Sequence, residues 1–132
     1  MQRKALVVDD EADLRRILLC VLAPVCEVLE ASNGPEALRL LRNERPRLML
    51  LDISMPEMGG IAILEAALVS DPSLIIVMLT GEQDLAVAKR ALEAGARAYI
   101  TKPFDSQFLR VEVQRLLEIV DAVPYRPWRV LS

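Results

Sequence analysis

The 132-residue chain contains no histidine and only two cysteines. The absence of histidine excludes imidazole bases, histidine-ligated metals and a phosphohistidine carried by this chain itself. Cys20 and Cys26 lie outside any C-x-x-C pattern, so neither a disulfide framework nor a zinc site is indicated, and both are expected to be small core residues. The chemistry left to the chain must use carboxylates, hydroxyls and amines.

The sequence also lacks a long hydrophobic segment and an excess of positive charge. Its longest nearly apolar stretch, from Ile17 to Cys26, contains Pro24 and is shorter than the ~18 residues that span a bilayer. The apolar run near the N-terminus, Ala5–Val8, is too short for a secretory signal. A net charge of −3 disfavours binding to a phosphate backbone. We therefore expect a cytoplasmic protein that binds neither a membrane nor nucleic acid directly.

The sequence is rich in apolar residues that recur in two alternating patterns. Hydrophobic residues make up 53% of the chain, enough for one globular domain of this length. Short apolar runs alternate with segments of helical period, which is typical of a buried parallel sheet with crossover helices. The predicted strands are Ala5–Val8, Glu27–Ala31, Leu48–Leu51, Leu74–Leu79 and Ala98–Thr101.

Five predicted helices follow these strands. The first begins after Glu11, stops before Pro24 and carries apolar residues at helical spacing. The second follows the Asn33 turn, and the third spans about 61–69. The fourth spans about 85–94 with Gly95 as its C-terminal cap, and the fifth runs from 105 or 106 to about 120. The apolar positions of the first helix are Leu14, Ile17, Leu18, Val21 and Leu22. The pattern predicts an α/β fold with a doubly wound, five-stranded parallel sheet.

Polar side chains stand where the predicted strands end. Asp9, Asp10 and Glu11 follow the first strand, Asp52 the third and Thr80 the fourth, and Thr101 and Lys102 end the fifth. Because the carboxyl ends of parallel strands meet at one edge, these side chains are expected to converge. Converging aspartates repel one another unless a cation relieves the repulsion, and an all-oxygen cluster suits Mg²⁺.

A lysine ammonium and a threonine hydroxyl beside such a metal are complementary to a tetrahedral dianion. The edge of the sheet therefore has the composition of a phosphoryl-binding site. A carboxylate next to Mg²⁺ can itself accept a phosphoryl group, because transfer requires mainly positioning and charge neutralisation. Asp52, on the central strand, is the best candidate for the acceptor.

Four motifs at these strand ends resemble the receiver domain of two-component response regulators, of the kind found in chemotaxis regulators. They are ALVVDDE at 5–11, LLDISMPEMGG at 50–60, MLTGE at 78–82 and AYITKPF at 98–104, and the resemblance covers residues 4 to about 120. It implies a flavodoxin-like (βα)5 fold with strand order 2-1-3-4-5. Residues 1–120 would form the receiver domain, and 121–132 a C-terminal tail or linker.

The resemblance also implies how the site would work. Asp52 would accept a phosphoryl group from the phosphohistidine of a sensor kinase or of a histidine phosphotransfer protein, and Lys102 would pair with a phosphoryl oxygen. The implied Mg²⁺ ligands are Asp9, Asp10, Asp52 and the backbone carbonyl of Ser54. The chain would be a phosphoacceptor switch that catalyses only its own phosphorylation and dephosphorylation, and not an enzyme acting on a separate substrate.

Further residues would transmit the signal. Thr80 would hydrogen-bond to the phosphoryl group and Tyr99 would turn inward, which changes the surface of the fourth helix, fifth strand and fifth helix. Pro103 would follow a cis peptide bond, and Glu82 would line the entrance to the site together with Ser54. A downstream effector, or an output domain outside this chain, would read the changed surface.

A homodimer through that same surface stays open. Charged residues that could pair across it are Arg90, Arg97, Arg110 and Glu112. Two other classes fit less well. A haloacid-dehalogenase-like phosphatase needs a second aspartate two residues after the nucleophile, where this chain has Ser54. A phosphate-independent adaptor would not need the intact aspartate, threonine and lysine set, and no G-x-G-x-x-G or Walker motif indicates nucleotide binding.

Overall fold

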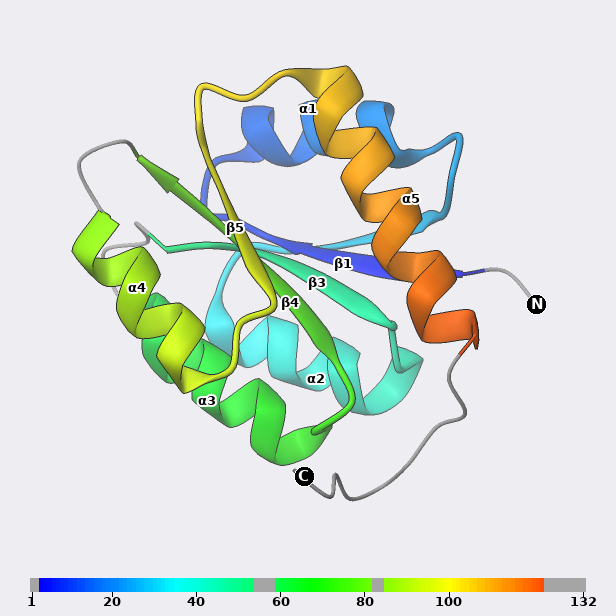
Figure 1. Cartoon of the computed structure of the whole chain (residues 1–132). Coiled ribbons are helices and arrows are strands. Elements are labelled where there is room, and N and C mark those ends of the chain that lie inside the picture. The colour runs from blue at the N-terminus through cyan, green and yellow to red at the C-terminus, as the bar shows by residue number, and fades with distance from the viewer. Residues whose placement is uncertain (1–2, 54–58, 82–84, 123–132) are drawn as a thin grey trace.

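The chain folds into a five-stranded parallel sheet covered by helices on both faces (Figure 1). The computed structural model describes residues 3–53, 59–81 and 85–122. The strands are β1 (Lys4–Val8), β2 (Glu27–Ala31), β3 (Leu48–Asp52), β4 (Ile75–Gly81) and β5 (Ala98–Lys102). The spatial order β2-β1-β3-β4-β5 confirms the predicted fold class and topology.

Two helices cover one face of the sheet and three cover the other (Figure 1). They are α1 (Ala12–Leu22), α2 (Gly34–Glu44), α3 (Gly60–Ser70), α4 (Leu85–Ala94) and α5 (Ser106–Ala122). Leu48 and Leu50 pack with α1 and α5, whereas Met49 and Leu51 pack with α2, α3 and α4. Burial on both faces explains why β3 reads as a continuous apolar run. Among the described helices, none is long and apolar enough to cross a membrane.

Three strands extend past the carboxyl ends of the apolar runs that predicted them. β3 includes Asp52, β4 includes Thr80 and Gly81, and β5 includes Lys102. The ladder continues because Thr80 pairs with Thr101, and Gly81 with Lys102. Backbone pairing thus holds the polar side chains at the sheet edge on rigid strands instead of on loops.

Some apolar residues of α1 and α5 are exposed, so the apolar pattern predicts more burial of each helix than the structure shows. Leu18, Val21 and Leu22 form the buried stripe of α1, but Ile17 is 50% exposed. The prediction that Cys20 belongs to the core is wrong, because it is exposed, while Cys26 is buried. At 100° per residue, position 20 lies on the side of the helix opposite that stripe. On α5, Phe108 and Val111 are likewise 54% exposed.

Local signals set the helix ends as the sequence predicts. The Asn33 side chain accepts a hydrogen bond from the Glu36 amide at 2.8 Å and caps α2. Gly95 follows α4 with φ of +121°, and the Ala96 amide donates to the Ala91 carbonyl at 2.9 Å. A Cβ atom at position 95 would also lie 2.6 Å from Cδ1 of Leu68, but the end of that side chain can shift, so the positive φ is the main reason for glycine there.

Gly60 marks a close approach between the start of α3 and the chain that follows β3. A Cβ atom at this position would lie 2.9 Å from the Cα of Ile53, the residue after Asp52. Gly59, by contrast, has open space around the corresponding position. The two adjacent glycines therefore have different roles, which the sequence alone does not distinguish.

Gly60→Ala should destabilise the protein by about 1–3 kcal/mol, because the added methyl group must displace backbone. Gly59→Ala is the matched control and should stay within about 0.5 kcal/mol of the wild type. Urea unfolding of both variants measures the difference. Equal stability of the two variants would show that the close approach of Ile53 does not constrain this turn.

Candidate functional site

Side-chain alternation brings Asp9, Asp52 and Lys102 to one side of the sheet edge. Each residue continues the alternate positions that face α1 and α5: Asp9 follows Val7, Asp52 follows Leu50, and Lys102 follows Ile100. Three strands thus deliver two acids and one base to the same place. The sequence could predict this convergence because all the strands are parallel and end at one edge.

Three carboxylates form a compact cluster at that edge. Asp9, Asp10 and Asp52 each offer an oxygen, and these oxygens all lie within 4.8 Å of one another. Asp9 and Asp52 are buried, whereas Asp10 is exposed. Lys102 Nζ lies 3.1 Å from Asp52 Oδ2 and is itself a quarter exposed. The positive charge of Lys102, in contact with Asp52, therefore lies beside a cluster of three carboxyl groups.

The Asp9 carboxyl is the most constrained member of the cluster. Its Oδ1 accepts a hydrogen bond from the Glu11 amide at 2.8 Å. Its Oδ2 is buried without a hydrogen-bond partner among the described residues. The pKa of Asp9 is raised to about 7, mainly by burial and in smaller part by the neighbouring Asp52. The Glu11 amide and the Lys102 charge act in the opposite direction.

The cluster fits a hard divalent cation. An oxygen-only donor set of carboxylates suits Mg²⁺, which keeps several waters and needs few protein ligands. The buried Asp9 Oδ2, left without a hydrogen bond by the described residues, is an available ligand atom, and the exposure of Asp10 leaves one side of the cluster open to water. Asp9, Asp10 and Asp52 could therefore hold the metal that the sequence predicts.

Thr80 lies on β4, next to the strand that carries Asp52, and its hydroxyl is available for a further contact as far as the described residues go. Leu79 is opposite Asp52 in the β3–β4 register, so Thr80 lies one residue further toward the open edge. Its side chain is fully buried, and its Oγ1 has no hydrogen-bond partner within the described part of the chain. Thr80 follows Ile76 and Met78, which face α2, α3 and α4.

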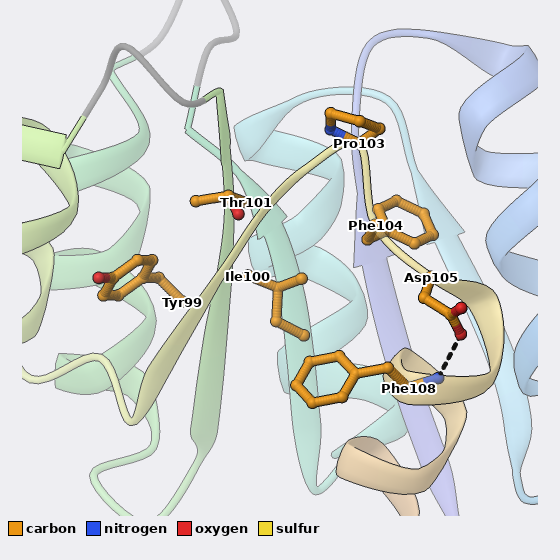
Figure 2. Close-up of a pocket in the computed structure, with 7 residues that line it drawn as sticks. All are labelled: Tyr99, Ile100, Thr101, Pro103, Phe104, Asp105 and Phe108. Carbon is orange, nitrogen blue, oxygen red and sulfur yellow. Dashed lines mark hydrogen bonds between the residues drawn. The ribbon is translucent and has the colours of Figure 1, made fainter.

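Tyr99 and the segment after it line a pocket of about 370 Å³ beside the site (Figure 2). Tyr99 and Ile100 point to opposite sides of β5, and Tyr99 is 40% exposed. Asp105 caps α5 by accepting a hydrogen bond from the Phe108 amide at 2.9 Å. The pocket is lined by Tyr99, Ile100, Thr101, Pro103, Phe104, Asp105 and Phe108.

The remaining predicted site residues have different outcomes. The Lys102–Pro103 peptide bond is cis, as the family resemblance implies. Ser54 and Glu82 lie outside the described residues, so the metal contact of the Ser54 carbonyl and the entrance role of Glu82 stay predictions. The division of the chain at residue 120 also stays a prediction, since α5 continues to Ala122 and 123–132 are not described.

Two of the charges considered for a dimer already have partners within the chain. Arg110 Nε donates to the Val21 carbonyl of α1 at 2.8 Å, and Glu112 pairs with Arg115 at 2.8 Å. These contacts use one nitrogen of Arg110 and one oxygen of Glu112, so the homodimer through this surface stays a prediction.

Arg15 is a residue of the site that sequence reasoning missed. Its Nη1 donates to the backbone carbonyl of Asp9 at 2.7 Å, and its Nε lies 3.4 Å from Glu30 Oε1. Glu30 belongs to β2, which is the neighbour of β1 in the sheet. No spacing in the sequence indicates these contacts, because both depend on how α1 folds back across the ends of two strands.

Comparison with known proteins identifies the family. The model of the response regulator receiver domain family matches residues 5–114. The chain therefore belongs to the response regulator receiver domains of two-component systems. Sporulation initiation phosphotransferase F of Bacillus subtilis is 34% identical over 120 residues, which cover 90% of this chain and 97% of that protein.

Other relatives are longer than this chain. The protein described as "Probable transcriptional regulator ycf27" of Porphyridium aerugineum is 37% identical over 91% of this chain, but the match spans only 50% of that protein. Among solved structures, a CheY-like receiver domain protein of Methanospirillum hungatei superposes with a TM-score of 0.86 and 31% identity. That match covers 92% of this chain and 98% of the chain in that structure.

Without a divalent cation, the free energy of unfolding should fall as pH rises from about 4 to about 7. The pKa of Asp9 is raised from 3.8 to about 7 in the folded protein, so the folded state binds more protons than the unfolded state over this window. Asp9→Asn keeps Oδ1 for the Glu11 amide and should be more stable than the wild type by about 1–3 kcal/mol at pH 8. At pH 4 the two should be similarly stable, and urea unfolding in a chelator measures both.

Glu118→Gln, which removes an exposed carboxylate of α5, is the control and should change stability by less than about 0.5 kcal/mol at either pH. A loss of stability in Asp9→Asn at pH 8, or a gain of the same size at pH 4, would contradict this explanation of the cluster.

Proposed function

We propose that this receiver domain accepts a phosphoryl group on the carboxylate of Asp52. The observation that carries the proposal is the buried Asp52 oxygen, 3.1 Å from Lys102 Nζ, in a carboxylate cluster that includes Asp9 and Asp10. Because these 132 residues contain no histidine, the phosphohistidine donor lies outside them, on a sensor kinase or a histidine phosphotransfer protein. The name of the B. subtilis relative, a phosphotransferase, is in keeping with this chemistry.

The transfer step requires one bond to form and one to break. An oxygen of Asp52 attacks phosphorus, and the P–N bond of the donor phosphohistidine breaks. The departing imidazole nitrogen keeps the electron pair and takes a proton from solvent. Lys102 then pairs with a phosphoryl oxygen in place of the Asp52 oxygen that it contacts before transfer. Its positive charge therefore stabilises the carboxylate before transfer and the phosphoryl group after it.

The carboxylate cluster would hold the metal for this step. Asp9, Asp10 and Asp52 would bind Mg²⁺ together with the Ser54 carbonyl, which lies outside the described residues. When bound, Mg²⁺ neutralises negative charge on the phosphoryl oxygens and on the acceptor carboxylate. Asp9 and Asp10 take no covalent part and serve to place this charge beside Asp52.

Thr80 and Tyr99 would convert phosphorylation into a change of surface. The unpaired Thr80 hydroxyl is available to donate a hydrogen bond to a phosphoryl oxygen. Movement of Thr80 makes room for Tyr99, whose partly exposed ring lies on the neighbouring strand two register positions away. A bias of a few kcal/mol between two states is enough to switch the surface of α4, β5 and α5.

The output is carried by another domain or protein. The chain spans about half the length of the ycf27 relatives it matches. An effector, or an output domain outside this chain, would recognise the switched surface. In this role the receiver is a phosphoacceptor whose only reactions are its own phosphorylation and dephosphorylation.

Incubation with acetyl phosphate or phosphoramidate and Mg²⁺ should add one phosphoryl group to the intact chain. Mass spectrometry of the whole protein measures the adduct, which should be labile to base and hydroxylamine, as expected of an acyl phosphate. Chelation of Mg²⁺ should abolish it. Asp52→Asn should show no adduct, because an amide oxygen at that position is not a comparable nucleophile.

An adduct of equal yield in Asp52→Asn would contradict the acceptor assignment. No adduct on the wild type, under conditions that label a known receiver and with a kinase donor also inactive, would favour the phosphate-independent adaptor.

Phosphorylation should change hydrogen–deuterium exchange in the peptide that spans β5, since Tyr99 lies there. Thr80→Ser keeps a hydroxyl and should retain the change, whereas Thr80→Val keeps the size of the side chain and should lose it while still being phosphorylated. Mass spectrometry of the peptides measures exchange on samples of known phosphoryl content. A full response in Thr80→Val would reject the route from Thr80 to Tyr99.

A further inference from the structure

Arg15 connects the two strand ends that flank one side of the carboxylate cluster. Its guanidinium donates to the Asp9 carbonyl at 2.7 Å through Nη1 and lies 3.4 Å from Glu30 Oε1 through Nε. The side chain is only 17% exposed, so water competes weakly for these contacts. None of the chemistry proposed above uses Arg15.

We propose that Arg15 is a positioning residue for the divalent cation: it fixes the turn that aims the carboxylates of Asp9 and Asp10. This inference rests on the proposed metal site and adds a residue that the metal does not touch. The guanidinium binds a backbone oxygen of Asp9 and does not occupy its carboxylate, whose Oδ2 has no hydrogen-bond partner among the described residues.

The planarity of the peptide group explains how one hydrogen bond orients two ligands. The carbonyl oxygen of Asp9 lies in the same rigid plane as the Cα atoms of Asp9 and Asp10. β1 ends at Val8, so this peptide group lies beyond the strand, although the Asp9 amide still donates to the Ala31 carbonyl at 3.1 Å. The amide is thus held by β2 and the carbonyl by Arg15, which together fix the direction in which the chain enters α1.

Glu30 completes the arrangement by compensating the charge of Arg15. A permanent positive charge one turn into α1 would by itself repel a cation bound at Asp9 and Asp10. The Glu30 carboxylate, 3.4 Å from Arg15 Nε, offsets that charge and also restrains the guanidinium. Loss of Glu30 should therefore weaken cation binding in the same direction as loss of Arg15, but by less.

The test is a calorimetric titration of Mg²⁺ into the whole chain at pH 8. Arg15→Met keeps the apolar stem of the side chain and should weaken Mg²⁺ binding about 10-fold or more, as is usual for a residue that orients a metal ligand. Arg16→Met removes the same charge from the next, exposed residue and should stay within about twofold of the wild type. Asp10→Asn, which alters a ligand, should bind most weakly.

A second readout separates positioning from a purely structural role. If Arg15 only stabilised the fold, Arg15→Met would lower the urea midpoint by the same amount with and without Mg²⁺. A positioning role predicts a smaller Mg²⁺-induced rise in the midpoint than in the wild type. Arg15→Lys keeps the positive charge and the apolar stem but lacks the planar pair of donors, so it should lose part of the Mg²⁺ affinity. If Arg15→Met does not fold, Arg15→Lys is the variant that tests the positioning role.

The measured affinities separate the positioning role of Arg15 from the metal site on which it rests. Equal Mg²⁺ affinities in Arg15→Met, Arg15→Lys and Arg16→Met, with weak binding in Asp10→Asn, would overturn the role of Arg15 and leave the metal site standing. Unchanged affinity in Asp10→Asn would overturn the metal site, and the role of Arg15 with it.

Discussion

The contact between Lys102 and Asp52 holds together a group of side chains that their charges would otherwise separate. Two of the three carboxylates at the sheet edge are buried, and the 3.1 Å ion pair places a compensating charge within the cluster. The compensation is incomplete: burial is the main cause of the raised pKa of Asp9, and the neighbouring Asp52 also contributes to it despite the Lys102 charge. An edge with this excess of negative charge is poised to bind a cation, and a bound cation would offset the repulsion between these carboxylates and an incoming phosphoryl group in the proposed transfer.

The rest of the fold holds the three carboxylates close together despite their repulsion. Parallel pairing of β1, β3, β4 and β5 fixes the strand ends, and side chains of both sheet faces are packed too tightly for the strands to slip. Gly60 lets α3 begin against Ile53, directly after the acceptor. Arg15 restrains the turn of the two other acids. Repulsion within the cluster is therefore resisted by the sheet, by a helix start and by a side chain from α1.

The sequence predicts the sheet and the membership of the cluster because these follow from local patterns, whereas the strand order is implied by the resemblance to the receiver family. Apolar runs mark the strands, and residues such as Asp52 and Lys102 stand at their ends. The sequence does not predict the burial or contacts of a residue where these depend on how helices and strands pack together. Cys20 and Ile17 resemble core residues until the buried stripe of α1 is known. The contacts of Arg15 with Asp9 and Glu30, and the close approach of Gly60 to Ile53, exist only in the folded chain.

Removing the lysine tests the charge imbalance most directly. In Lys102→Met the carboxylates lose their compensating charge, and a bound divalent cation no longer meets a neighbouring positive charge. The measurement is the rise in the free energy of unfolding produced by a fixed Mg²⁺ concentration, compared between Lys102→Met and the wild type, with Lys4→Met as the control. The account predicts a larger rise in Lys102→Met and an unchanged rise in Lys4→Met. An equal or smaller rise in Lys102→Met would contradict it.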